Sequence, residues 1–397
     1  MIDKIFAEEI KDSRGKSTIK VTVYSDDKSA SFSVPSGAST GAHEAYVIEN
    51  AKAIKNINEI IAPVLIGKNI ENQKEIDEFL INLDGTKNKS KLGGNTIIGV
   101  SIAIVKTAAK VKGMEVFEYL RTLVEVKLLQ RKTPYLYMNL INGGKHTHNN
   151  LAFQEYHVVP DTQNASEAVQ IGITIQNSVK EIILGKYGKE SLVLGDEGGY
   201  APKITDIREP LVILSDVMEK NNLTGKVRLA LDVAASSFYK DGNYIIGNKN
   251  VPKEELMSIY KNLINEFNLL SIEDPFNEED FEGFANLKIQ NPNLKVVGDD
   301  LTVTNVERLQ MAIDKKSINA MIIKPNQIGT LSETLATMKL ARENNIELIV
   351  SHRSGETDDD FIADLAYAFG CFGLKSGAPS KPERKVKYGR LIEISKK

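Results

Sequence analysis

The pattern of apolar and polar positions differs between the first third of the chain and the rest. Residues 18–24 alternate between apolar and polar side chains, which is the period-two pattern of a half-buried strand. Residues 25–28 form a polar turn, and the run 29–34 alternates again until it stops at Pro35. The two alternating runs therefore predict a β-hairpin.

Helical spacing follows this hairpin. Apolar residues recur every three or four positions between 53 and 65, and Ile76 and Leu80 mark a shorter run of the same kind. Residues 97–111 are apolar nearly all round, which is typical of a buried helix. We therefore predict a small α+β domain over residues 1–125.

Six later stretches share another layout, in which an apolar run of β type ends in an ionisable residue and leads into a turn. They are 192–197, 229–232, 269–273, 296–299, 321–324 and 348–352. From Glu273 on, successive polar ends are 26, 25 and 28 residues apart, which is the length of one βα unit. We predict a β/α barrel of the TIM type over 135–397, joined by a linker at 126–134 that is rich in charge and contains a proline.

Parallel strands that close into a barrel bring their C-terminal ends to one face, so these ionisable residues are expected in one pocket. Asp232, Glu273 and Asp299 end three of the runs in succession. A ligand set made only of carboxylates suits a hard cation such as Mg²⁺. The alternative is that each is a helix cap or turn residue. Three in succession, beside a lysine and a histidine, favour the metal site.

Two further residues have the chemistry of an acid and a base. Lys324 ends the next run, where neighbouring cations would lower its pKa and leave a neutral amine able to act as a base. A structural ion pair with one of the carboxylates is the alternative. Glu197 lies on a turn flanked by glycines, which let the backbone approach a ligand. It is a candidate general acid, although such a motif alone is typical of an ordinary turn.

Three loop segments are candidates for substrate contact. Residues 35–41 are small and polar, as in a phosphate cradle or a lid, but lack the lysine and glycine spacing of a nucleotide loop, so a flexible connection is the alternative. Residues 142–150 contain His146 and His148 without a further His or Cys to complete a zinc site. Arg353 and neighbouring hydroxyls follow the last run in a pattern that suits phosphate, and Lys375 adds a cation after the next strand.

Composition limits the other classes of function. The 397 residues are 42% hydrophobic and 26% charged with a net charge of −3, and no basic stripe indicates nucleic-acid binding. Cys371 is the one cysteine, so a disulfide within the chain is excluded and a reducing, cytoplasmic location is expected. Its apolar neighbours favour an inert core thiol. The N-terminus lacks the pattern of a signal peptide, and no apolar run reaches the ~20 residues of a membrane span.

Taken in order, these motifs resemble the enolase family, the glycolytic enzymes that dehydrate 2-phosphoglycerate to phosphoenolpyruvate. The matching motifs lie at 12–15, 35–41, 84–86, 142–155, 195–199, 231–234, 271–276, 299–302, 324–331, 351–357 and 375–379. The resemblance covers almost the whole chain and implies the same fold, a small α+β domain on a β/α barrel.

The resemblance also implies roles for individual residues. Asp232, Glu273 and Asp299 would hold one Mg²⁺, and Ser39 would ligate a second together with substrate oxygens. Lys324 would remove the proton beside the substrate carboxylate, and Glu197, with Glu155 close by, would protonate the leaving hydroxide. The substrate contacts implied are His146, Gln154, His352, Arg353, Ser354 and Lys375. Because members of this family form dimers or octamers, a homo-oligomer is expected.

The chain departs from the family pattern at five positions, which are Ser17, Gly94, Ser237, Ser376 and Pro382. None is a residue to which the resemblance assigns chemistry, so supporting contacts are in question more than reaction type. Two other functions stay open. One is a different superfamily member, such as an acid-sugar dehydratase or a racemase, which would lack the serine loop and the 351–357 motif. The other is a non-catalytic or weakly active paralogue with a binding role.

Overall fold

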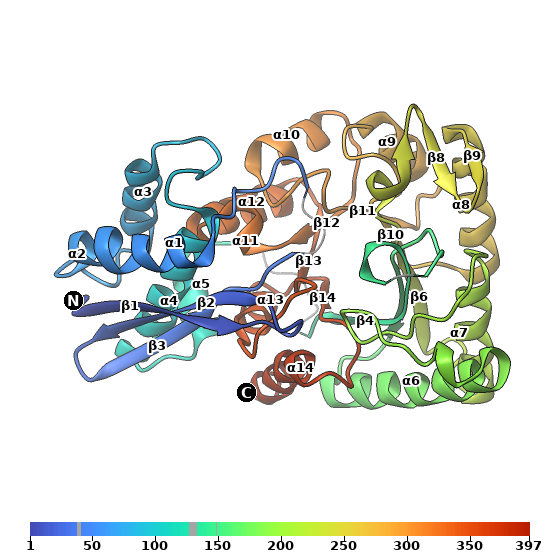
Figure 1. Cartoon of the computed structure of the whole chain (residues 1–397), viewed down its shortest axis with the longest axis horizontal. Coiled ribbons are helices and arrows are strands. Elements are labelled where there is room, and N and C mark those ends of the chain that lie inside the picture. Colours follow the sequence, from blue (N-terminus) through green and yellow to red (C-terminus); the bar gives the residue numbers. More distant parts are fainter. Residues whose placement is uncertain (38–40, 127–132, 148) are drawn as a thin grey trace.

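A computed structural model of the chain describes residues 1–37, 41–126, 133–147 and 149–397. The N-terminal part, blue to cyan in Figure 1, lies beside a barrel formed by the remaining residues. This arrangement confirms the predicted fold class, a TIM-type barrel with a smaller N-terminal α+β part.

The N-terminal part contains a three-stranded antiparallel sheet in the order β1 (Lys4–Lys11), β2 (Ser17–Ser25) and β3 (Lys28–Ser33). Ser25 pairs with Lys28, so a two-residue turn joins β2 to β3 and the predicted hairpin is confirmed. Strand β1 was not predicted, because only Ile5 and Ala7 of its residues are buried and its alternation is weak.

Helices cover this sheet. They are α1 (Asn50–Lys55), α2 (Ala62–Leu65), α3 (Gln73–Asp84), α4 (Gly94–Val111) and α5 (Val116–Leu123), with a π-helical segment at Asn56–Ile61 that joins α1 to α2. Helix α4 packs on β2 and β3 and contacts α11 of the barrel. Within the described residues, α4 is the one helix long and apolar enough to cross a membrane. However, 83% of that 18-residue window is buried inside the protein, as in a core helix.

The predicted linker, 126–134, falls mainly outside the described residues. Val126 follows α5 without regular structure, and Thr133 and Pro134 precede the first barrel strand. The boundaries of the two domains therefore stay a prediction.

Eight short strands close into the barrel. In barrel order they are β4 (Tyr135–Asn142), β5 (Glu155–Pro160), β6 (Val227–Asp232), β10 (Ser271–Glu273), β11 (Lys295–Gly298), β12 (Ala320–Ile323), β13 (Glu347–Ser351) and β14 (Gly373–Lys375). Most of their residues are buried on both faces, which explains the continuous apolar runs in the sequence. A small cluster that includes Tyr137, Val159 and Ile322 fills the interior of the barrel.

Two features of the barrel differ from the sequence prediction. Residues 192–197 do not form a barrel strand; Leu194 makes one isolated bridge to Tyr200, and the segment is a loop above the barrel. Strand β5 runs antiparallel to both β4 and β6. Its first residue, Glu155, therefore lies at the same barrel face as the last residue of β6, Asp232, with which it pairs.

The outer helices and a small sheet complete the barrel domain. The helices are α6 (Ala165–Tyr187), α7 (Glu209–Lys220), α8 (Lys253–Phe267), α9 (Phe281–Gln290), α10 (Val306–Asp314), α11 (Pro325–Ile328), α12 (Leu331–Glu343), α13 (Phe361–Ala368) and α14 (Pro382–Ile394). A three-stranded sheet, β7 (Tyr239–Lys240), β8 (Asn243–Ile246) and β9 (Lys249–Val251), is inserted between β6 and α8. Helix α13 packs on α5, so the two parts of the molecule share one apolar core.

Candidate active site

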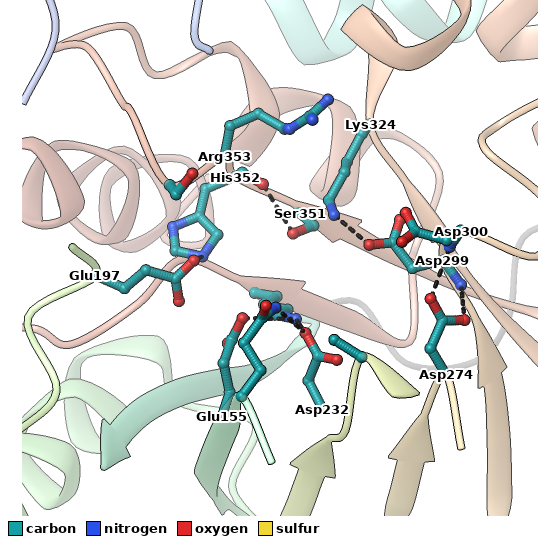
Figure 2. A pocket seen from close by; sticks show the side chains of 14 residues that line it. Glu155, Glu197, Asp232, Asp274, Asp299, Asp300, Lys324, Ser351, His352 and Arg353 are labelled. Carbon is teal, nitrogen blue, oxygen red and sulfur yellow. Dashed lines mark hydrogen bonds and ion pairs between the residues drawn. The ribbon is translucent and has the colours of Figure 1, made fainter. Parts of the chain in front are cut away.

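A pocket lies at the barrel face where the strand ends converge (Figure 2). Its lining residues are Gln154, Glu155, Glu197, Asp232, Ala234, Asp274, Asp299, Asp300, Lys324, Ser351, His352, Arg353, Ser354 and Lys375. Ten of the residues singled out from the sequence are among them. Glu273 ends β10 and contacts the lining residue Lys375. Ser39 lies outside the described residues, and of His146 the structure describes only the backbone, in a 3₁₀ turn at Gly144–His146.

Two groups of side chains face each other across this pocket. The carboxylate side consists of Asp232, Glu273, Asp299, Lys324 and Lys375. The imidazole side consists of Asn139, Glu197, His352 and Arg384. Figure 2 shows Lys324 and Glu197 approaching the pocket from different sides.

On the carboxylate side, Lys375 lies among the carboxylates. Its Nζ is 2.8 Å from Asp232 Oδ2 and 2.9 Å from both carboxylate oxygens of Glu273, and all three side chains are buried. Burial raises the pKa of Glu273 well above its ordinary value, and the neighbouring carboxylate of Asp232 raises it further. Burial alone would lower the pKa of Lys375, but the surrounding carboxylates raise it well above its ordinary value. The buried carboxylate oxygens on this side are of the kind that bind a divalent cation.

A second group of carboxylates overlaps the predicted triad only at Asp299. Ligand oxygens of Asp274, Asp299 and Asp300 all lie within 4.8 Å of one another. Both oxygens of Asp274 accept backbone N–H bonds, from Asp299 at 2.9 Å and from Asp300 at 2.8 Å. Asp274 therefore holds the turn after β11, and the site contains two overlapping groups of carboxylates that share Asp299.

Lys324 follows β12 directly and is the last residue before α11. Its backbone N–H donates to Thr304 Oγ1 at 2.9 Å, and its Nζ forms an ion pair with Asp299 Oδ2. Burial lowers the pKa of Lys324, and Arg353 and Lys375 lower it further, but the negative charges around it, chiefly those of Asp299 and Glu273, raise it, and the net pKa lies above its ordinary value. The expectation of a lowered pKa was therefore wrong, because it took account of the neighbouring cations and not of these carboxylates.

Glu197 occupies a tight turn on the imidazole side. A Cβ at Gly199 would lie 2.5 Å from Asn142 Oδ1, so this position of the turn excludes a side chain. The carboxylate of Glu197 is buried; Oε2 accepts from Asn139 Nδ2 at 3.0 Å, and Oε1 lies 3.2 Å from His352 Nε2. Burial lowers the pKa of His352 to about 4, so the imidazole is neutral near pH 7.

Glu155 lies between the two sides of the pocket. Its Oε1 is 3.4 Å from Lys375 Nζ, and its Oε2 is 2.9 Å from Nε2 of His157. Burial raises the pKa of Glu155 well above its ordinary value, and Glu197 adds to this effect. His157 was not singled out from the sequence; burial lowers its pKa to about 3, so it is neutral.

Arg353 receives its partners from distant segments. Its guanidinium forms an ion pair with Glu44, at 3.0 Å between Nη1 and Oε2, and donates to Asn326 Oδ1 at 3.1 Å. Nearby, Ser36 and Gly355 exchange two backbone hydrogen bonds, at 2.8 and 2.9 Å. Ser36, at the start of the small-residue loop, and Glu44, which follows it, are thus both attached to the barrel beside Arg353.

Sequence reasoning missed several residues that position the site. They are Glu44, His157, Asp274, Gln327 and Arg384. The sequence could have indicated Asp274, since it directly follows Glu273. The contact of Glu44 with Arg353 spans 309 residues, so no local pattern indicates it.

Comparison with known proteins places two family models on the chain. Residues 2–120 match the N-terminal domain of enolase, and residues 130–397 match its C-terminal TIM barrel domain. Enolase of Methanocaldococcus jannaschii is 44% identical over 99% of this chain and 94% of that protein. Enolase of Methanococcus aeolicus is 42% identical over 98% and 94%, and Enolase 1 of Entamoeba histolytica is 42% identical over 99% and 95%.

Proposed function

The chain belongs to the enolase family, whose hydro-lyases interconvert 2-phosphoglycerate and phosphoenolpyruvate, and on this premise we propose how its residues divide that reaction. Lys324 is the base and Glu197 is the acid. The observation that carries this proposal is their placement on different sides of one pocket, whose lining also includes Asp232, Asp299, Arg353 and Lys375.

The carboxylate side is the proposed metal site. Family membership implies a divalent metal, and we propose that it is Mg²⁺ held by Asp232, Glu273 and Asp299. A second Mg²⁺ would be held by Ser39 together with substrate oxygens. Bound cations of this kind place positive charge beside the substrate carboxylate, where the enolate dianion develops. Lys375 supplies a further positive charge from the protein itself.

Lys324 must lose its proton before it acts as a base. In the structure Asp299 stabilises the ammonium form. If Asp299 also binds a cation, its carboxylate stabilises that ammonium less, and Arg353 and Lys375 then favour the neutral amine. The free amine takes the proton from carbon 2 of the substrate.

Glu197 gives its proton to the hydroxyl that leaves from carbon 3, so water departs as the double bond forms. Glu155 lies between the two sides of the pocket, with its Oε1 3.4 Å from Lys375 Nζ. Arg353 and Ser354 would hold the phosphate, and Arg353 must then exchange or share its partner Glu44. His146, Gln154 and His352 complete the proposed substrate contacts.

Two further proposals concern the cellular context. We infer a homo-oligomer, a dimer or an octamer, from the family to which the chain belongs. The single cysteine supports a cytoplasmic location, and membership of the enolase family supports a glycolytic or gluconeogenic role. Light scattering on the purified protein would measure the oligomeric state.

The testing experiment is an assay of the purified protein on 2-phosphoglycerate with Mg²⁺, with excess chelator, and with Mg²⁺ restored. We expect phosphoenolpyruvate to form only when Mg²⁺ is present. Lys324→Ala protein purified in the same way controls for contaminating activity. Full turnover in metal-free buffer would remove the proposed metal site, and no turnover under any condition would favour a paralogue kept for binding.

A further inference from the structure

Arg384, near the start of α14, is fully buried, yet the proposed mechanism gives it no role. Within the described part of the chain, the one carboxylate oxygen within 4.0 Å of its guanidinium nitrogens is Glu383 Oε1, at 3.6 Å from Nε. A buried cation with so distant a counter-charge is costly unless its N–H groups are hydrogen-bonded. Its hydrogen bonds therefore indicate what the residue does.

Those hydrogen bonds all go to the segments that carry the imidazole side of the pocket. Nη1 lies 2.7 Å from His352 Nδ1 and donates to the carbonyl of Arg353 at 2.8 Å. Nη2 donates to the carbonyl of Ser354 at 2.8 Å and to that of Asp196 at 3.4 Å. One guanidinium thus connects the segment after β13 with the turn that carries Glu197.

The contact with His352 determines which ring nitrogen carries the proton. A guanidinium only donates hydrogen bonds and does not lose its proton in proteins. His352 Nδ1 must therefore accept, and in the neutral ring the hydrogen is on Nε2. Nε2 is the atom that lies 3.2 Å from Glu197 Oε1, so in this tautomer the N–H is next to that oxygen, although the two atoms do not have hydrogen-bond geometry.

We propose that Arg384 is a positioning residue for proton transfer at Glu197, and that it acts by holding His352 in the Nε2–H tautomer. This inference deepens the proposed function and rests on the role of Glu197 as the acid. With the other tautomer, the Nε2 lone pair would face Glu197 and would compete with the leaving hydroxyl for the proton of the acid. The second oxygen of Glu197 already has its own donor, Asn139.

The test compares dehydration with exchange of the hydrogen on carbon 2 in heavy water, because only dehydration needs Glu197. Arg384→Met removes the donors at similar length. We expect it to slow dehydration by about 10- to 100-fold, the usual loss when a group that orients a functional residue is removed, and to slow exchange by less than about threefold. Tyr388→Phe is the control, since it removes a buried hydrogen bond to the Gly377 carbonyl from the same helix while Arg384 and its contact with His352 stay in place. We expect both rates of this control to stay near wild type.

A double-mutant cycle with His352→Gln separates positioning from packing. The glutamine amide presents an N–H near the position of Nε2 without help from Arg384. In that background we expect Arg384→Met to cost less than about threefold in dehydration. The proposal would be overturned if Arg384→Met slowed dehydration as much in the His352→Gln background as in the wild type. Equal losses of dehydration and exchange in the single variant Arg384→Met would also overturn it.

Nitrogen NMR of the imidazoles provides a readout that needs neither activity nor a folded variant. The chain has five histidines, so assignment is tractable. We expect the hydrogen of His352 on Nε2 in the wild type; a hydrogen on Nδ1 would refute the inference even if Arg384→Met does not fold. Failure of the wild type to dehydrate and exchange 2-phosphoglycerate would instead refute the proposed function, and the tautomer would still be measured.

Discussion

The carboxylate side and the imidazole side of the pocket are both buried, but they balance their charges differently. On the carboxylate side, acids outnumber the lysines that contact them, and burial next to Asp232 raises the pKa of Glu273. On the imidazole side, Oε2 of Glu197 accepts a hydrogen bond from Asn139, Oε1 lies 3.2 Å from His352 Nε2, and Arg384 contacts the other ring nitrogen of His352.

The difference indicates how each side depends on ligands. Buried carboxylates with raised pKa values store unfavourable free energy that a bound cation would relieve. The hydrogen bonds of Glu197 with Asn139 and of His352 with Arg384 are made within the protein and need no ligand to hold their geometry. We therefore expect metal and substrate to change the carboxylate side more than the imidazole side.

The largest effects are expected from Lys324→Ala on the carboxylate side and Glu197→Gln on the imidazole side, because the two residues act at different steps of the reaction. Lys324→Ala should reduce both dehydration and exchange of the hydrogen on carbon 2 by at least ~1000-fold, because no enolate forms without the base. Glu197→Gln should reduce dehydration similarly and leave exchange largely intact. Deuterium uptake into 2-phosphoglycerate, followed by NMR, measures this. Exchange that survives in Lys324→Ala but not in Glu197→Gln would reverse the two roles.

Glu273→Gln should affect metal binding and stability in opposite directions. It should weaken Mg²⁺ binding by more than the roughly 10- to 100-fold that loss of a partner behind a ligand costs, and activity should be lost with it. Without metal, the variant should unfold at the same temperature as the wild type or a higher one, because the raised pKa of Glu273 shows that its charge is unfavourable there. Calorimetric titration and thermal unfolding in chelator measure the two effects. A lower unfolding temperature would mean that the positive charge of Lys375 already balances the negative charge of Glu273.

A third prediction uses pH to test the imidazole side. His352 has a pKa of about 4 in the folded protein and ~6.5 when unfolded, so its contribution to stability is present above pH 6.5 and is lost as pH falls toward 4. Between pH 6.5 and 5 the wild type should lose about 1 to 2 kcal/mol from this residue. His352→Gln should therefore show a shallower fall in unfolding free energy over that range, measured with urea. Parallel curves would mean that His352 titrates normally in the folded state.

The smallest effect should come from a residue on neither side. Ser237 is half-buried in the 3₁₀ turn at Ala235–Phe238 and borders a cavity that is separate from the pocket around Lys324 and Glu197. Ser237→Glu should change the rate of dehydration by less than about tenfold, or ~1.4 kcal/mol of barrier. A much larger gain would identify this chain as a weakened enzyme and support a binding role.

Some features of the site follow from the sequence with little help from the fold. Short apolar runs that end in Asp232, Glu273, Asp299 and Lys324 predict strands whose polar ends share one face, and the structure brings these residues together. This inference works because burial on both faces leaves a continuous apolar run and closure of a barrel aligns strand ends. Residues 192–197 have the same pattern but form a loop, because an apolar run alone does not specify pairing.

Other features were decided only by the tertiary structure. The reversed direction of β5 brings Glu155 to the active face from the start of its strand, and no periodicity in the sequence specifies strand direction. The raised pKa of Lys324 and the tautomer of His352 depend on Asp299 and Arg384, which lie 25 and 32 residues away along the chain. The sequence by itself determined which residue types end each strand, since a buried strand appears in the sequence as a short apolar run. Which of them touch, and so which hold protons, depends on distances of a few ångströms that exist only once the barrel has closed.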